Sequence, residues 1–208
     1  MHISENLSVL EASTFNYCTS LVELYVPGSV TLLSSSSVGN CSSLKRLKIG
    51  EKDATGSTII GNCAVIGNNQ LERLELGANV DSLVQYSLDE LNNLKVFICW
   101  APTPPKLDDY QCFSPAASRI TAPLYVRRAS LDAYRTTRQW KDFQTIVAIE
   151  DVGDMNGDGS LTVGDVTALI SKVLNGDAEG NVLADVNLDG VVNIADVTAL
   201  ISRVLSGS

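Results

Sequence analysis

The sequence contains little histidine and no long apolar segment, and both shortages exclude broad classes of function. Its single histidine is His2, so neither a histidine-based hydrolytic triad nor an imidazole-bound zinc site is expected. No segment approaches the roughly 18 to 20 consecutive apolar residues that a membrane helix needs. Residues 1–5 lack the basic and apolar segments of a secretory signal, so we expect the signal of an exported form to lie outside this sequence.

Cysteine occurs in an odd number and without the pairs typical of zinc or redox sites. The five cysteines cannot all pair within one chain, so at least one is a free thiol, and none belongs to a C-x-x-C motif. The count alone leaves the compartment of the protein open.

Acidic charge is concentrated at the carboxyl-terminal end. Residues 1–150 carry 15 acids and 13 bases, whereas residues 151–208 carry 9 acids and 2 bases, so most of the net charge of -9 belongs to the tail. This asymmetry predicts two domains with different tasks, which we place at residues 1–149 and 150–208. It argues against a nucleic-acid partner, whose phosphates the tail would repel, and suits a hard cation better.

The same leucine pattern occurs four times in the first part of the chain, once in each of four successive repeats. In such a pattern the alternating apolar residues face inward from a short strand, and each repeat hides its apolar side only by stacking on its neighbours. We therefore predict an α/β leucine-rich-repeat solenoid with short parallel strands, built on Leu21-x-x-Leu24-x-Val26, Leu44-x-x-Leu47-x-Ile49, Leu71-x-x-Leu74-x-Leu76 and Leu94-x-x-Phe97-x-Cys99.

A cysteine precedes the first leucine by three positions in two of these repeats, at Cys18 and Cys41, and Asn68 and Leu91 hold the same place later. A position that accepts such different side chains is better explained by inward packing than by reactivity. Cys63 is interpreted as the same feature, displaced by the four-residue expansion between the second and third repeats.

The combination C-x-x-L-x-x-L-x-V-P followed by Gly-Ser-Val, over residues 18–30, resembles the BspA-like leucine-rich repeats of bacterial surface proteins. Only the first repeat keeps the proline, Pro27, and the longer spacing before the third repeat predicts a bulge at its rim. Residues 101–149 resemble the terminal unit that closes such arrays. Ser130 is expected to cap a helix there, and Trp140, Phe143 and Ile146 to cover the last repeat, with a grip on a sugar ring as the alternative.

Two acidic loops in the tail, which begin at Asp154 and Asp185, fit the calcium-binding pattern D-x-[DN]-x-[DN]-G with an acid at position 12. Calcium takes about six to eight oxygens, which alternate residues of a tightly wound loop can supply. Gly159 and Gly190 permit the sharp turn at position 6. The predicted ligands, including a backbone carbonyl at position 7, are Asp154, Asn156, Asp158, Ser160, Thr162 and Asp165, and Asp185, Asn187, Asp189, Val191, Asn193 and Asp196.

A matched amphipathic helix follows each loop, at residues 166–174 and 197–205, but the segments before the loops are poor helix formers. Duplicated loops that end in Asp and carry only an exiting helix resemble the dockerin family, over residues 154–205. The resemblance implies a small, mainly α domain with two loop-helix units, two bound calcium ions and docking on a cohesin-like partner.

The expected partner surface departs from cellulosomal dockerins, which often place Ser-Thr at loop positions 10 and 11 and basic residues along the helix. An apolar contact is therefore expected with a cohesin, another protein or the repeat domain of the same chain. The near identity of the helices would allow two orientations related by an internal twofold. The residues assigned to this surface are Val163, Gly164, Ile170, Ser171, Ile194, Ala195, Ile201 and Ser202.

These features predict a non-enzymatic, exported or cell-surface bacterial protein whose repeats recognise a protein or glycan and whose dockerin attaches it. One alternative is a non-catalytic or targeting part of a polysaccharide-degrading assembly, since dockerins usually accompany glycoside hydrolases. Another is a dockerin that only caps its own repeats. An enzymatic pair of acids is not expected, because the candidates fall on solvent-facing places where charge normally keeps a solenoid soluble: Glu72, Glu75, Asp89 and Glu90.

Overall fold

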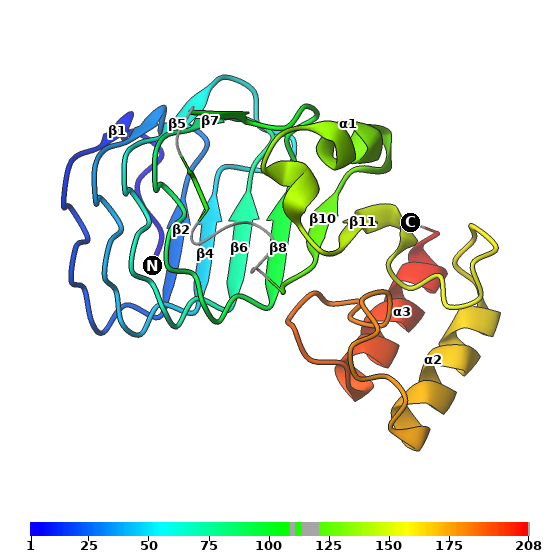
Figure 1. The fold of residues 1–208 in the computed structure, drawn as a ribbon. Helices are drawn as coiled ribbons and strands as arrows, with labels where there is room; N and C mark the ends of the chain where they lie inside the picture. The colour runs from blue at the N-terminus through cyan, green and yellow to red at the C-terminus, as the bar shows by residue number, and fades with distance from the viewer. Residues whose placement is uncertain (109–110, 114–120, 208) are drawn as a thin grey trace. The chain divides into compact units, whose positions relative to one another are not determined.

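The computed structural model describes residues 1–108, 111–113 and 121–207 (Figure 1). The chain forms two compact units, Met1–Ile146 and Val147–Ser208, which we call the array and the tail unit. No helix in the described ranges has the length and apolar character to cross a membrane.

One sheet of the array is built from the predicted leucine strands. Its order is β11-β10-β8-β6-β4-β2, and the pairings from β2 through β10 are parallel. Along β2, β4 and β6 the exposure alternates as the pattern requires, with Leu24, Leu47 and Leu74 buried in the core, whereas β8 and β10 are buried throughout. The predicted solenoid of short parallel strands is confirmed, with strands β2 (Glu23–Val26), β4 (Arg46–Ile49), β6 (Arg73–Leu76), β8 (Val96–Cys99), β10 (Leu124–Val126) and β11 (Ile146–Ala148).

A second parallel sheet has the order β1-β3-β5-β7-β9, with one strand from each successive turn of the chain. Figure 1 shows the turns winding repeatedly between the two sheets. The bounds of these strands are β1 (Val9–Leu10), β3 (Leu32–Leu33), β5 (Thr58–Ile60), β7 (Val80–Leu83) and β9 (Lys106–Leu107).

The four-residue expansion lies between the two sheets. Residues 50–58 separate β4 from Ile59, whereas residues 27–31 separate β2 from Leu32, the register partner of Ile59. The register between β5 and β7 shifts at Thr58 and Ile59. The irregularity therefore lies in the second sheet, at the end of the second repeat, and not at the rim of the third repeat, where a bulge was expected.

The inward ladder that precedes the leucine strands is confirmed at Cys41, Asn68 and Leu91, which are all buried. The Asn68 side chain accepts a hydrogen bond from the Cys41 amide (2.9 Å) and donates to the carbonyls of Val38 (2.7 Å) and Val65 (2.8 Å). It thereby supplies buried backbone groups with partners where two turns meet.

The interpretation of Cys63 as a displaced ladder residue is wrong. Its amide bonds to the Gln85 carbonyl, in the same way that the Ser13 amide bonds to the Ser35 carbonyl. Its φ of 52° matches the positive φ of Ser13, Ser36 and Tyr86. Cys63 therefore occupies a left-handed corner of its turn, and Asn68 alone holds the ladder place because the expansion lies before the corner.

An aromatic cluster closes the array beyond β8. Trp140 and Phe143 are buried and pack with Phe97 and Phe113 at ring-centroid distances of 5.1 to 6.3 Å. Cap packing is thus confirmed, and the alternative of a sugar grip at these rings is wrong because no face is exposed. The short helices of this region are η2 (Arg128–Ser130), α1 (Leu131–Thr136) and η3 (Trp140–Asp142).

Ser130 does not cap α1 through its side chain. A 3-10 turn leads directly into the helix, and the Ser130 hydroxyl instead donates to the Pro102 carbonyl at 2.8 Å. The residue therefore ties the helix to the proline segment.

The tail unit consists of η4 (Ile149–Asp151) followed by two loop-helix units, with helices α2 (Val163–Asn175) and α3 (Ile194–Ser206). Both helices begin with a capping box, formed by Thr162 with Asp165 and by Asn193 with Asp196. Both end at a left-handed glycine. This is the small helical unit that the duplicated sequence predicts.

Candidate metal centre

The first aspartate of each loop is buried and organises the backbone of the turn. Asp154 accepts hydrogen bonds from the amides of Gly157 (2.7 Å) and Gly159 (2.8 Å). Asp185 accepts from the amides of Asp189 (3.0 Å) and Gly190 (2.9 Å). Their side chains thus wind each loop tightly around its first position.

The glycine at position 6 has the expected conformation in both loops. Gly159 has a φ of 83° and Gly190 a φ of 86°, in the left-handed region that other residues rarely adopt. The predicted sharp turn at this position is confirmed.

The aspartate at position 12 joins the end of each loop to its beginning. Asp165 accepts from the amides of Met155 (2.9 Å) and Thr162 (2.9 Å). Burial disfavours its charged form, but the hydrogen bonds from Thr162 and from the Asn156 and Met155 amides outweigh burial and hold the pKa of Asp165 below its usual value. Asp165 is therefore ionised at neutral pH although it is fully buried.

The second loop repeats this closure. Asp196 accepts from the amides of Asn187 (3.1 Å) and Asn193 (2.8 Å). Sequence reasoning assigned positions 9 and 12 to a metal, but it did not reveal that the same residues also start the following helix. An acid three residues after Thr or Asn is the signal that could have shown it.

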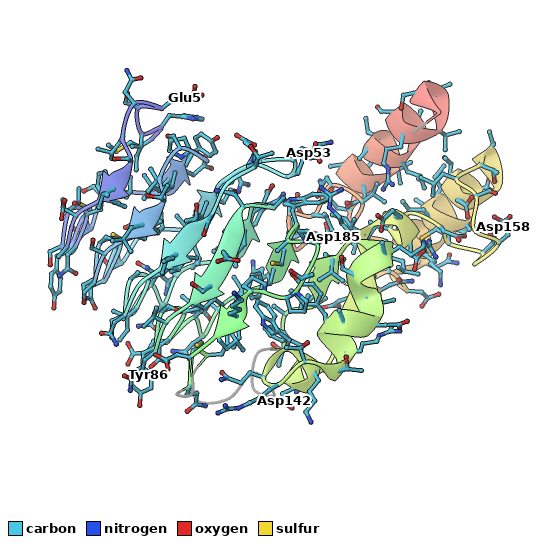
Figure 2. All side chains as sticks on the ribbon, turned by 90° about the horizontal axis from the view of Figure 1, so that it is seen from above. Glu5, Asp53, Tyr86, Asp142, Asp158 and Asp185 are labelled. Atoms are coloured by element: carbon cyan, nitrogen blue, oxygen red, sulfur yellow. The ribbon has the colours of Figure 1, made fainter. Side chains whose placement is uncertain are left out.

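The residues at positions 3 and 5 are paired in the same manner in both loops. The Asn156 side chain donates to the Asp158 carboxylate at 2.8 Å, and the Asn187 side chain donates to Asp189 at 3.0 Å. The amides at position 7, of Ser160 and Val191, donate back to these aspartates. Figure 2 shows Asp158 in the loop that leads into α2.

The donor set of the loops suits a hard cation. Every expected donor is an oxygen, and Asp154, Asp165, Asp185 and Asp196 are at most 8% exposed. None of the ion pairs among the described residues involves a loop aspartate. Buried carboxylates without a basic partner call for another source of positive charge.

The electrostatics of the second loop agree with this need. Burial raises the pKa of Asp185, and the nearby charges of Asp196 and Asp189 raise it further. The loop carboxylates nonetheless remain directed at backbone amides. Within the described residues, no three His, Cys, Asp or Glu side chains are gathered closely enough to hold a metal ion. The donor chemistry fits calcium, and binding would require these side chains to turn from the amides toward a common centre.

An apolar stripe runs along the outside of both helices. Of the residues assigned to the partner surface, Val163 and Ile194 are 70% and 68% exposed, and Ile170 and Ile201 are 36% and 40% exposed. The small residues Gly164, Ser171, Ala195 and Ser202 are exposed as well. The structure therefore places all eight on the surface.

Sequence reasoning missed two members of this stripe. Leu174 and Leu205 end the two predicted helices and were not assigned to the partner surface, but they are 80% and 83% exposed. The buried face consists of Val166 with Leu169, and of Val197 with Leu200. Each leucine lies four residues after an exposed isoleucine, Ile170 or Ile201, and this spacing is the signal that could have placed it outside.

The four acids considered for catalysis fall into two separate pairs. Glu72 immediately precedes β6 and forms ion pairs with Lys45 (3.4 Å) and Lys95 (3.0 Å). The hydrogen bond from Lys95 lowers the pKa of Glu72. Glu75 pairs with Arg73 at 3.2 Å. Asp89 and Glu90 lie in the corner before β8. A general acid needs a raised pKa, so Glu72 is a poor candidate.

Comparison with known families matches both units of the chain. Residues 1–116 match the BspA type leucine rich repeat region, in six copies, and residues 152–205 match the dockerin type I domain. No curated protein matches the chain.

Proposed function

Because the chain belongs to the BspA-type leucine-rich repeat family and continues into a type I dockerin domain, we propose that it is an exported, non-catalytic binding protein. Both domains are interaction modules, and both typify extracellular or surface proteins. The array recognises a target, and the dockerin attaches the protein to a cohesin-type partner. The duplicated exposed stripe beside the two acidic loops is the observation that carries this proposal.

The two loops would hold one calcium ion each. Dockerin domains bind calcium, and the supporting observation is a matched set of oxygen donors in both loops. Side chains would come from positions 1, 3, 5, 9 and 12, and the carbonyl oxygen from Ser160 or Val191. Bound calcium supplies positive charge that offsets the repulsion among the buried aspartates, so binding contributes to the folding free energy of the tail unit.

The attachment surface is apolar and present twice. Val163, Ile170 and Leu174 on α2 correspond to Ile194, Ile201 and Leu205 on α3 in the duplicated sequence. A partner that fits one helix therefore fits the other in an orientation related by the internal twofold. The exposed hydroxyls and small residues between them leave room for close approach.

The proposal is tested with immobilised type I cohesin modules and the full chain, in calcium and in chelator. Ile170→Asp or Ile201→Asp alone should weaken binding about twofold, since one of two equivalent modes remains. The double variant should abolish binding. Ile59→Asp in the array is the matched control, because Ile59 is 39% exposed and lies outside the stripe.

Two results would change the proposal. Calcium-independent binding would contradict the role of the acidic loops in attachment. A double variant that binds like the wild type would exclude the stripe as the attachment surface. If no cohesin module is bound, removal of residues 151–208 tests the alternative that the dockerin caps its own repeats: loss of array stability would support that role. A non-catalytic place within a polysaccharide-degrading assembly is compatible with cohesin attachment.

A further inference from the structure

A pocket of about 430 Å³ opens on the solvent-facing side of β2, β4 and β6. Its volume falls within the range of sites for small ligands. Figure 2 shows Glu5, one of its lining residues, on the opposite side of the array from the corner residue Tyr86. The lining side chains that bear on its chemistry are Tyr25, Arg46, Lys48, Glu51, Arg73 and Glu75.

Two arginines that line this pocket are neighbours on adjacent strands. Arg46 and Arg73 are register partners of β4 and β6. Like charges in this position destabilise a sheet. The array keeps both by pairing Arg46 with Glu23 at 2.8 Å and Arg73 with Glu75 at 3.2 Å. The result is a row of donors and acceptors facing solvent.

A second row lies two positions further along the same strands. Tyr25, Lys48 and Glu75 are register partners, and the Lys48 ammonium lies 2.6 Å from Glu51 and 3.9 Å from Glu75. The Tyr25 hydroxyl donates to Glu51. Burial and this carboxylate raise the pKa of Tyr25, so the phenol remains protonated. The residue keeps its hydroxyl at any physiological pH.

The charges of the lining nearly cancel. The acids Glu5, Glu23, Glu51 and Glu75 face the bases Arg46, Lys48 and Arg73. Such a pocket does not select a strongly charged ligand, but it offers many polar contacts, because a guanidinium has five N–H donors and a carboxylate about four acceptor positions. Hydroxyl groups both donate and accept, so several adjacent hydroxyls on a ring would match this surface.

We propose that this pocket binds a neutral sugar residue of an uncharged glycan. The inference rests on the proposed function, because it names the target of the array. A protein partner is less suited, since the tyrosine and arginines that could anchor one, Tyr25, Arg46 and Arg73, are each already paired with a glutamate. The exposed apolar side chains of the array other than Met1 lie outside the pocket lining, at Leu7, Tyr17, Val22, Ile59 and Tyr86.

Affinity electrophoresis of the full chain with calcium tests the proposal. Native gels contain a neutral galactomannan, xyloglucan or mixed-linkage β-glucan, polygalacturonate as the anionic comparison, or no polysaccharide. At least one neutral polysaccharide should retard the wild type, and polygalacturonate should not. Lys48→Met should weaken retardation about tenfold, because the variant loses a charged hydrogen-bond donor and the ion pairs that hold the Glu51 and Glu75 carboxylates in place.

Lys95→Met is the matched control. Lys95 lies on the same face and pairs with Glu72 at 3.0 Å, but it is not part of the pocket. The Lys95→Met variant should be retarded as strongly as the wild type. Circular dichroism establishes that both lysine variants are folded. Retardation by none of the neutral polysaccharides, stronger retardation by polygalacturonate, or equal loss in both lysine variants would each overturn the proposal. Cohesin binding by the same samples reports separately on the proposed function.

Discussion

The guanidinium of Arg203 donates a hydrogen bond of 2.6 Å to the carbonyl oxygen of Val152. The last helix therefore holds the segment that leads into the first acidic loop. Lys172 occupies the equivalent place on α2 in the duplicated sequence. The two loop-helix units are thus alike in sequence, but only the second ties down the start of the tail unit in this way.

Replacement of this arginine should destabilise the tail unit alone. We expect Arg203→Met to lower its free energy of unfolding by about 1–2 kcal/mol, because a half-buried charged donor is lost and a carbonyl loses its partner. Lys172→Met, the control, should change it by less than about 0.5 kcal/mol. Urea unfolding followed by far-ultraviolet circular dichroism in calcium measures both. Equal effects of the two substitutions would contradict a specific role for Arg203.

Calcium removal should unfold the tail unit and leave the array folded. The carboxylates buried in the loops repel one another without a cation, so the helices that follow lose their support. The tail unit contains no tryptophan or tyrosine, whereas Trp100 and Trp140 report on the array. Chelator should therefore abolish most of the helical circular dichroism and leave the thermal transition seen by tryptophan fluorescence unchanged. A helical signal indifferent to chelator would refute this coupling.

Loss of one loop should halve the calcium stoichiometry. Asp154→Ala removes the carboxylate at position 1 and the acceptor of the Gly157 and Gly159 amides. Titration calorimetry should then report one ion per chain in place of two. Asp177→Ala removes the same charge from an exposed position between the two loop-helix units and should retain both ions. One ion in the wild type would show that only one loop binds.

The buried asparagine between turns should matter more than its exposed neighbour. Asn68→Ala removes the partner of the Cys41 amide and of the Val38 and Val65 carbonyls, which should cost about 2–4 kcal/mol of array stability. Asn69→Ala should cost less than about 0.5 kcal/mol, since that side chain is exposed. Unfolding monitored by tryptophan fluorescence separates the two. Similar midpoints for both variants would argue that Asn68 only fills space.

The parts of the fold that follow from periodicity could be predicted from sequence. Recurring inward leucines such as Leu24, Leu47 and Leu74 define the strands because each repeat must bury the same face. Cys63 was misplaced because a spacing alone does not show on which side of the corner the extra residues lie. Backbone conformation decided that point, since Cys63 has a positive φ and the ladder residues Cys41 and Asn68 do not.

The acidic loops were predictable as a motif, but their internal bonding was not. The pattern identifies oxygen donors, whereas the amides that Asp154 and Asp165 accept from depend on how the loop winds. Likewise, Leu174 was not assigned to the exposed surface, although it lies four residues after Ile170 and therefore on the same face of the helix, whereas Leu169 is on the buried face. The calcium ligands and the boundary at residues 149 and 150 stay predictions.

The stacking of each turn on the next determines how the array folds. Each parallel pairing joins a strand to its counterpart in the next turn, as Val9 pairs with Leu32 and Leu47 with Leu74. Each turn that docks on a formed neighbour therefore meets nearly the same loop-closure entropy, and no distant segment has to be found. Assembly can begin at any well-formed turn and propagate to its neighbours, so a local fault delays one step and leaves the other nuclei intact.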